Sequence, residues 1–472
     1  MIRRPIRLLA AGVATLALAV TAASAWAAPA PKGPDLKPST KVAMAKQTRG
    51  ITAAKAAALA SYKPTDNFTA TWKRADALKV AGDATNTTPI IPPDFPVISQ
   101  DVWQWDTWPL TNIDTKPITY KGWHVIMSLV APRDIPFGDR HWVARIGYYY
   151  SKDGHNWIYG GHLIPEARGI GCMEWAGTAI MTGKNTVRQF YTTVGHQRGG
   201  PTCRTSPPYD TMQRLAVTQG QIHADSKGVW FTGFTKHTVI AQPDGKYYQT
   251  QDQGIPPTDY AFRDPFIFRN PKDKKIYAVW EGNTGGLTGT YQCTKRDLGN
   301  LPPGHTVDPI SANYTGNIGL MKATNKSLTT WKLLSPLLSA NCVNRQTERP
   351  HVVFSKGLTY LFTISHKFTY APGVTGPDGV YGFVGPSLRS DYRPMNGSGL
   401  VLGNPPEAPE QNYSHEVLPN LMVQSFIDQV PTGNGNKPGG TLAPTLQLAF
   451  DGANSYLTRV LPYGYIPAMA GN

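Results

Sequence analysis

The sequence predicts an all-β fold of many short strands, for which a sandwich, a barrel and a propeller are the candidate architectures. The 472 residues include 46 Gly and 41 Pro, which implies many turns, and 12 Trp, 22 Tyr and 15 Phe, which strands favour. A repeated unit favours the propeller. In this unit an acid and a proline begin an apolar strand, and a turn connects that strand to a second one. The unit occurs at 263–280 and 348–362. Propeller blades point their first strands at one axis, so such units would gather distant acids into one pocket.

A second repeat is a hairpin whose turn is followed by tryptophan. It occurs at 147–157 and 319–331, with an Asp-Gly turn in the first copy and an Asn-containing turn in the second. Such centres suit hairpin turns. We expect Trp157 and Trp331 to pack back on their turns.

The N-terminus has the features of an export signal. Arg3, Arg4 and Arg7 precede an apolar run at 8–20, and a small-residue cleavage site follows at 25–27. This predicts a signal peptide over 1–27 and a secreted mature protein. Residues 28–66 read as a flexible leader with a short Ala-rich helix at 51–62, and 67–472 as one β domain. No later apolar run is long enough to span a membrane, so no membrane association is expected after cleavage.

Charge and cysteine content exclude two classes of site. The net charge is +15, and it falls to +12 without residues 1–27, which contain three arginines and no acids. Lys and Arg are scattered, with no basic run among aromatics, so nucleic acid is not an expected partner. The four cysteines contain no Cys-x-x-Cys pair, so a zinc site is not expected. After export they can form disulfides, and their spacing leaves all three connectivities open.

Three acids lie within apolar or aromatic sequence: Asp106, Asp264 and Glu348. Burial of an unpaired carboxylate is costly, so such an acid is either salt-bridged or functional. For a single acid we would favour pairing with a neighbouring arginine. Three acids near the starts of predicted strands favour an active site.

The segments around these acids resemble the signature blocks of glycoside hydrolase family 68, which contains levansucrases, inulosucrases and some secreted sucrose-cleaving fructosidases. Trp-Asp-Thr-Trp-Pro at 105–109 resembles the nucleophile block, Arg-Asp-Pro at 263–265 the transition-state block, and Thr-Glu-Arg-Pro at 347–350 the acid/base block. Their order and rough spacing agree across nearly the whole mature chain. The resemblance implies a five-bladed β-propeller with a central funnel and a secreted sucrose-dependent fructosyltransferase, similar to the Gram-negative levansucrases.

The resemblance also implies roles for the acids. Asp106 would be the nucleophile that attacks the fructosyl anomeric carbon, and Glu348 the acid/base. Such a pair supports a retaining mechanism through a covalent fructosyl-enzyme. Asp264 would hold fructosyl hydroxyls and stabilise the transition state, and Arg263 would bind sugar hydroxyls.

Further residues resemble parts of the family's sugar site. Trp105 and Trp175 resemble sugar-contacting tryptophans, and Ala176 stands where many members have Ser. Gln346 stands where many members have Glu, and either side chain can hydrogen-bond a sugar. Glu281 resembles a supporting acid behind the pocket.

Two more positions lie later in the chain. Tyr413 resembles a family tyrosine near the nucleophile. His366 stands where Gram-positive relatives tend to have Arg and follows the Gram-negative pattern. We interpret it either as an acceptor-side residue that biases product length or as a structural histidine.

The same resemblance implies how the cysteines pair and whether the protein binds a metal ion. A Cys293–Cys342 bridge, as in some Gram-negative relatives, would clamp the region where many Gram-positive relatives bind Ca²⁺. We therefore expect no metal site, no cofactor and no calcium requirement. Cys172 and Cys203 are a second expected pair.

The activity has alternatives. By analogy we expect β-(2→6) fructan or fructo-oligosaccharides with glucose release, sucrose and sugar acceptors as the partners, and a monomer. The alternatives are a mainly hydrolytic sucrose-cleaving β-fructofuranosidase of the same family, a non-catalytic carbohydrate-binding propeller, and a related propeller acting on other furanosides. A protein that only binds sugar has no need of both a nucleophile and an acid.

Overall fold

The computed structural model describes residues 67–165, 168–204, 206–254, 260–467 and 469. The predicted signal peptide at 1–27, the leader at 28–66 and its helix at 51–62 lie outside the described residues. All described residues belong to one compact unit.

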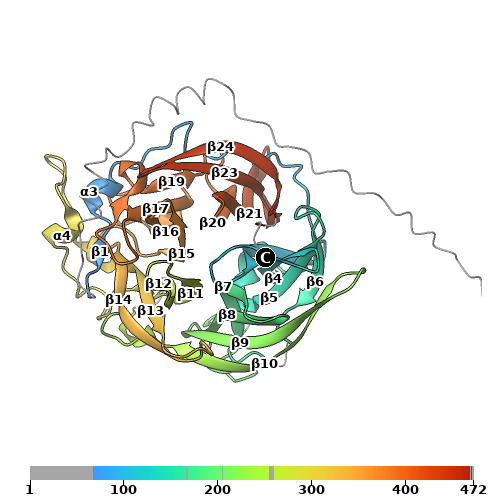
Figure 1. Cartoon of the computed structure of the whole chain (residues 1–472). Coiled ribbons are helices and arrows are strands. Elements are labelled where there is room, and N and C mark those ends of the chain that lie inside the picture. Colours follow the sequence, from blue (N-terminus) through green and yellow to red (C-terminus); the bar gives the residue numbers. More distant parts are fainter. Residues whose placement is uncertain (1–66, 166–167, 205, 255–259, 468, 470–472) are drawn as a thin grey trace, which may run out of the picture. The chain divides into compact units, whose positions relative to one another are not determined.

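The described residues form five blades of antiparallel strands, which follow one another around a central axis (Figure 1). Blade one contains β2 (Val102–Thr111), β4 (Trp123–Pro132), β5 (Arg145–Ser151) and β6 (Ile158–His162), with β3 (Thr119–Tyr120) paired to β4. Blade two contains β7 (Met173–Met181), β8 (Thr186–Val194), β9 (Gln213–Ala224) and β10 (Val229–Ala241). A short parallel pairing of Leu110 with Ala179 and Thr111 with Ile180 joins these blades into one nine-stranded sheet.

The other three blades are separate five-stranded sheets. Blade three contains β11 (Phe262–Arg269), β12 (Ile276–Asn283), β13 (Gly316–Ala323) and β14 (Trp331–Ser339), and β1 (Ala70–Thr71) adds in parallel to β14. Blade four contains β15 (Glu348–Ser355), β16 (Leu358–Ser365), β17 (Gly379–Gly385), β18 (Arg393–Pro394) and β19 (Leu400–Gly403). Blade five contains β20 (Asn412–Val417), β21 (Met422–Thr432), β22 (Gly435–Leu442), β23 (Pro444–Asp451) and β24 (Asn454–Tyr463).

Helices in the described residues are short. The α-helices are α3 (Arg74–Ala77) and α4 (Lys295–Leu298), and the 3₁₀ helices are η1 (Phe137–Val143), η3 (Gln251–Gln253), η4 (Pro309–Asn313), η5 (Lys367–Thr369) and η6 (Met395–Gly397). None of the helices described is long and apolar enough to cross a membrane. The prediction of an all-β propeller with five blades is confirmed.

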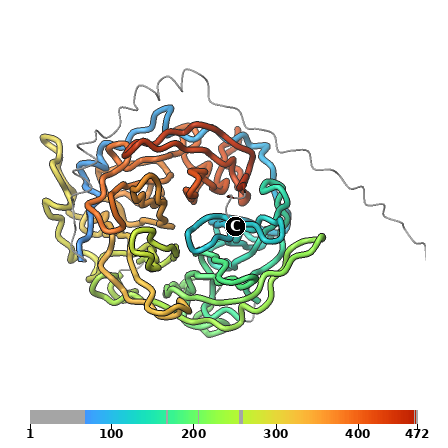
Figure 2. Tube along the Cα trace, in the orientation of Figure 1, coloured from blue at the N-terminus to red at the C-terminus, as the bar shows by residue number. Residues whose placement is uncertain are grey.

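The tryptophans of the hairpin repeat behave differently from each other. The Trp331 indole donates a hydrogen bond to the Leu328 carbonyl in its own turn, at 2.9 Å, as expected. The Trp157 indole instead donates to the Gly464 carbonyl at 2.8 Å. The segment after β24 thus replaces the turn as the partner of Trp157 and lies beside blade one (Figure 2).

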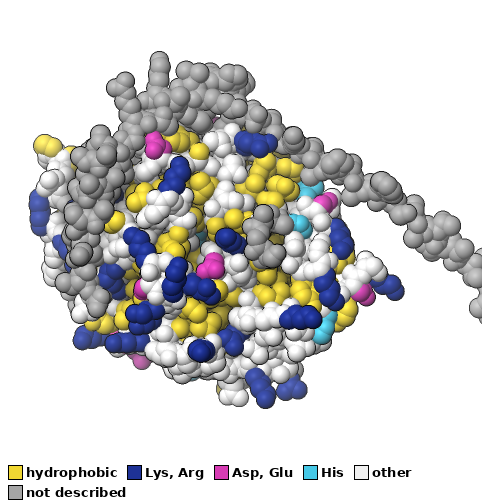
Figure 3. Space-filling view, viewed as in Figure 1, with side chains coloured by type: hydrophobic (Ala, Val, Ile, Leu, Met, Phe, Trp, Pro, Cys, Tyr) yellow, Lys and Arg dark blue, Asp and Glu magenta, His cyan; other side chains and the backbone are white. Residues whose placement is uncertain are grey.

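Aromatic side chains fill the space within and between blades. Trp280 is fully buried on β12, and its cross-strand partner on β13 is Gly319. A Cβ atom at that glycine would lie only 2.3 Å from the Trp280 ring, so the ring requires a residue without a side chain there. Lys and Arg occupy several separate places on the face shown in Figure 3, in line with the scattered charge of the sequence.

Candidate active site

The first strand of every blade contains a β-bulge at an equivalent position. The pairing register with the neighbouring strand shifts just after Trp105 in β2, Trp175 in β7, Arg263 in β11, Glu348 in β15 and Tyr413 in β20. A bulge bends a strand and re-aims the side chains beside it. The same kind of bulge therefore occurs in all five blades, where it directs side chains toward the central axis.

The residue after each of these positions has an uncommon backbone conformation in four blades. Asp106, Asp264, Arg349 and Ser414 have φ values of 45°, 61°, 42° and 60°, in the left-handed region. For residues other than glycine this conformation costs about 1–2 kcal/mol, and such strain clusters at functional sites. Blade two has Ala176 at the same position.

These bulges bring the three predicted acids to one cavity of about 290 Å³. Nine of the ten predicted sugar-site residues line it: Trp105, Asp106, Trp175, Arg263, Asp264, Gln346, Glu348, His366 and Tyr413. The tenth, Glu281, does not line the cavity but is fully buried and pairs with Arg263.

Asp106 is half-buried in this cavity. Loss of solvation raises the pKa of its carboxyl group, and the nearby Glu348 adds to the rise. The Arg349 guanidinium, a hydrogen bond from the Ser414 hydroxyl and Arg140 act in the opposite direction, because they stabilise the carboxylate.

Asp264 is held by hydrogen bonds to residues of two other blades. Its backbone N–H donates to the Thr192 hydroxyl at 2.8 Å, and its Oδ2 accepts from the Arg349 backbone N–H at 3.3 Å. Burial raises the pKa of its carboxyl to about 7. Arg263 opposes the rise, and the carboxylates of Asp106 and Glu348 add to it.

Glu348 has a separate partner for each carboxylate oxygen. Its Oε1 accepts from Arg263 Nη2 at 3.1 Å, and its Oε2 accepts from the Tyr413 hydroxyl at 2.5 Å. Burial, and then the charge of Glu348, raise the pKa of Tyr413 well above its usual range, so Tyr413 remains a donor. These contacts fix the orientation of the carboxyl group across three blades.

Arg263 also pairs with the fully buried Glu281, with Nε 2.7 Å from Oε2. Glu281 accepts a hydrogen bond from the Thr347 backbone N–H at 3.2 Å. Burial raises its pKa well above the usual range, against the charge of Arg263. Arg263 therefore connects the buried Glu281 to Glu348, the predicted acid/base.

Arg349 is a buried cation to which the sequence reasoning assigned no role. It donates to the Thr107 carbonyl at 2.9 Å, to Glu416 Oε2 at 3.2 Å and to the Ser414 hydroxyl. Burial raises the pKa of Glu416 to about 7, and Arg349 opposes that rise. The guanidinium thus links blades one, four and five beside Asp106.

The η1 helix supplies a cavity wall that the sequence reasoning also missed. Arg140 Nη2 lies 3.3 Å from Asp428 Oδ1, and the His141 carbonyl accepts from the Trp175 indole at 3.2 Å. Burial, followed by the charges of Arg140, His366 and Arg263, holds the pKa of His141 well below its usual range, which favours the neutral imidazole. The available signal was the run of charged and aromatic residues at 139–142.

His366 lies in a stack of three rings at the cavity. Its ring centroid is 3.5 Å from that of Tyr413 and 4.8 Å from that of the exposed Phe368. Its Nδ1 lies 2.7 Å from Asp378 Oδ2. Burial opposes protonation of His366, but the hydrogen bond and charge of Asp378 outweigh it and raise the pKa.

Comparison with known proteins decides the family. The family model described as Levansucrase/Invertase matches residues 62–467. An "Extracellular sucrase" of Zymomonas mobilis is 45% identical over 410 residues, covering 85% of this chain and 96% of the relative. A levansucrase of the same organism is 47% identical over 410 residues, covering 84% and 92%. The crystal structure of levansucrase from Gluconacetobacter diazotrophicus has a TM-score of 0.77 at 41% identity and covers 87% and 95% of the two chains.

The chain belongs to the levansucrase/invertase family. This confirms the family that the three sequence blocks predicted. Among the described residues, no group of three or more His, Cys, Asp or Glu side chains is arranged to hold a metal ion.

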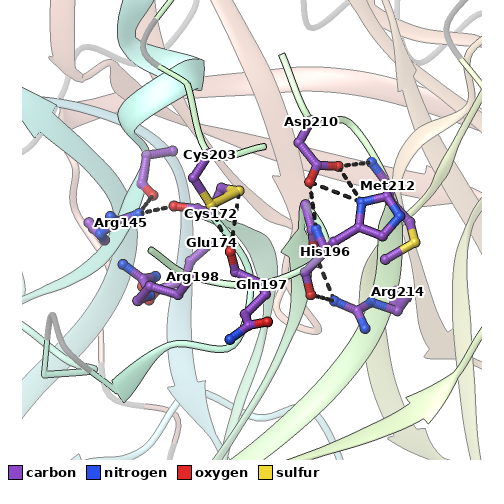
Figure 4. Close-up of a disulfide and its surroundings, with 12 residues drawn as sticks. Arg145, Cys172, Glu174, His196, Gln197, Arg198, Cys203, Asp210, Met212 and Arg214 are labelled. Atoms are coloured by element: carbon purple, nitrogen blue, oxygen red, sulfur yellow. Dashed lines mark hydrogen bonds and ion pairs between the residues drawn. A yellow bond between two sulfur atoms is a disulfide. The ribbon is translucent and has the colours of Figure 1, made fainter. Parts of the chain in front are cut away.

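Both predicted disulfides are present. Cys293 and Cys342 join the segment after β12 to the segment that leads into β15. Cys172 and Cys203 join the start of β7 to the connection between β8 and β9 (Figure 4). The first pair therefore braces the entry to Glu348, and the second braces a connection of blade two.

Proposed function

We propose that this chain is an extracellular enzyme that transfers fructosyl groups from sucrose to sugar acceptors and releases glucose. Its membership of the levansucrase/invertase family supports this, as do the names of its relatives. The observation that carries the proposal is the convergence of Asp106, Asp264 and Glu348 on one cavity. We further propose that 1–27 is a signal peptide, 28–66 a leader and 67–472 the catalytic domain, and that the enzyme acts as a monomer.

The proposed mechanism is a double displacement with retention. Asp106 attacks the anomeric carbon of the fructosyl unit as Glu348 protonates the departing glucosyl oxygen. The bond between them breaks, glucose leaves, and fructose is bound to Asp106 as an ester. An acceptor hydroxyl then attacks the same carbon, Glu348 takes its proton, and the Asp106 carboxylate is released.

The surroundings of each acid fit these roles. Arg349 and Ser414 stabilise the carboxylate form of Asp106, which the attack requires. Tyr413 and Arg263 fix both oxygens of Glu348, so that one carboxyl group can serve both steps. Asp264, held by the Arg349 backbone, is proposed to bind fructosyl hydroxyls and stabilise the oxocarbenium-like transition state.

The remaining choices concern the acceptor. We propose β-(2→6) transfer, with His366 on the acceptor side of the cavity. The relative named as an extracellular sucrase favours a second candidate function, which is hydrolysis of sucrose on the same residues with water as the acceptor. The partition depends on how the acceptor region binds sugar compared with water.

Incubation of the mature protein with concentrated sucrose separates these functions. Glucose in clear excess over free fructose supports transfer, equal amounts support hydrolysis, and the release of neither sugar contradicts both. Glu348→Gln should lower glucose release by about 10²–10⁴-fold, the usual contribution of an acid/base. Asp106→Asn should lower it by several orders of magnitude. Asp391→Asn, a matched change at an exposed position of blade four, should leave the rate unchanged.

His366→Ala tests the acceptor assignment. It should change the length distribution of the products more than the rate of sucrose consumption. An unchanged distribution would leave His366 as a structural histidine.

A further inference from the structure

A stacked pair of aromatic rings connects two blades at the edge of the cavity. Trp142 lies in η1, lines the cavity and is half-buried. Its ring stacks on Tyr209, with centroids 3.8 Å apart and planes 6° apart. Tyr209 comes from the connection between β8 and β9 and is not among the cavity-lining residues. It therefore supports Trp142 from behind.

The segment that carries Tyr209 is fixed on both sides of this residue. Before it, the disulfide joins Cys203 to Cys172. After it, the buried Asp210 accepts from the His196 backbone N–H at 2.8 Å and lies 2.9 Å from His196 Nδ1 (Figure 4). A connection that is otherwise largely exposed thus holds Tyr209 in one place.

Further contacts of Arg198 hold this segment against the wall of the cavity. Arg198 Nη2 lies 2.8 Å from the buried Glu174 Oε1 (Figure 4). The Arg198 backbone N–H also donates to the Ile170 carbonyl at 3.0 Å. Glu174 precedes Trp175, another cavity-lining residue. The segment is therefore fixed to the strand that forms the cavity wall.

We infer that Trp142 is a stacking surface for a sugar unit of the acceptor, and that Tyr209, held by the Cys172–Cys203 tether, is a positioning residue for it. The inference rests on the proposed function. The three acids lie on the first strands of their blades, where the transferred fructosyl unit must bind. Trp142 instead lies in η1, between β4 and β5 and not on a first strand, so we place it against acceptor units that lie beyond the two units of sucrose. An indole offers an apolar face to the C–H groups of a neutral sugar.

Kestose, which is sucrose extended by one fructosyl unit, is the probe. Calorimetric titration would use Glu348→Gln protein, in which turnover is slow enough for binding to be measured. Adding Tyr209→Ala should weaken kestose binding by about two- to tenfold, the range for loss of one aromatic pair. Tyr209→Phe keeps the stacked ring and should bind as the parent does, and sucrose binding should be unchanged in both. The double variant Cys172→Ser, Cys203→Ser should weaken kestose binding to the same extent as Tyr209→Ala.

Near-ultraviolet circular dichroism adds a measurement that needs no sugar. Tyr209→Ala should change the aromatic signal and Tyr209→Phe should preserve the indole bands, with the melting temperature confirming that both variants fold. Unchanged kestose binding in Tyr209→Ala, equal losses in both variants, or an unchanged aromatic signal would overturn the inference. If the parent bound neither sugar, the proposed function and the acceptor role would fail together, and the spectrum would still decide whether Tyr209 positions Trp142.

Discussion

Ser414 offers a sharp test of how the proposed nucleophile is kept ionised. Its hydroxyl donates to Asp106 and accepts from Arg349. Its φ of 60° suits glycine, so Ser414→Gly removes the hydroxyl without straining the backbone. A hydrogen bond to a charged group contributes about 1.5–3 kcal/mol, which corresponds to about 10- to 150-fold in kcat/KM where ionisation limits the rate.

The effect should depend on pH. The lost hydrogen bond favoured the carboxylate, so its removal raises the pKa of Asp106 further, and the acidic side of the kcat/KM profile moves to higher pH. The difference from the parent enzyme should be largest at low pH and narrow as pH rises. Glucose release at low sucrose concentration measures kcat/KM, and Ser327→Gly in an exposed turn is the matched control. An equal loss at every pH, or no loss at all, would refute this account of Ser414.

Three further predictions concern stability and metal. Asp264→Asn should abolish activity but raise the melting temperature, and the rise should be larger at pH 8 than at pH 4.5. The reason is that the Asp264 carboxyl has a pKa of about 7 in the folded state, so the folded state loses stability as pH rises from about 4 to 7. An equal rise in melting temperature at both pH values would contradict the shifted pKa. Replacing Cys293 and Cys342 with serine should lower the free energy of unfolding by about 4 kcal/mol, because the bridge closes a loop with a sequence separation of 49. Unfolding in denaturant measures this loss. No change would show that the bridge does not constrain the unfolded chain. EDTA should leave the melting temperature unchanged, and a loss of folding that calcium restores would refute the expected independence from calcium.

The sequence carried much of the fold and the three acids because their signals are local. Each acid lies within a few residues of the proline or tryptophan that marks its block, and each block coincides with a bulge in the first strand of a blade. The pattern of strands and turns is also a local signal. The blocks around the acids and the strands can therefore both be recognised without knowing which blades are neighbours.

The supporting contacts were not predictable because they join distant parts of the chain. Arg349 meets Thr107 across 242 positions, and Arg140 meets Asp428 across 288. Trp157 was expected to pack on its own turn but contacts Gly464, 307 positions away. Closure of the propeller ring creates these pairs, and no local pattern in the sequence marks them.

The five blades share the bulge but not the polar residue beside it. In the described residues, blades one, three, four and five each place a polar side chain at the left-handed position, and blade two places Ala176 there without a left-handed φ. Blade two instead contributes the wall through Trp175 and the tethered segment behind Trp142. The left-handed positions are therefore those whose side chains supply charge or a hydrogen bond around the three acids. Because packing of all five blades stabilises these costly conformations, substitutions that relieve them should raise stability and reduce activity together.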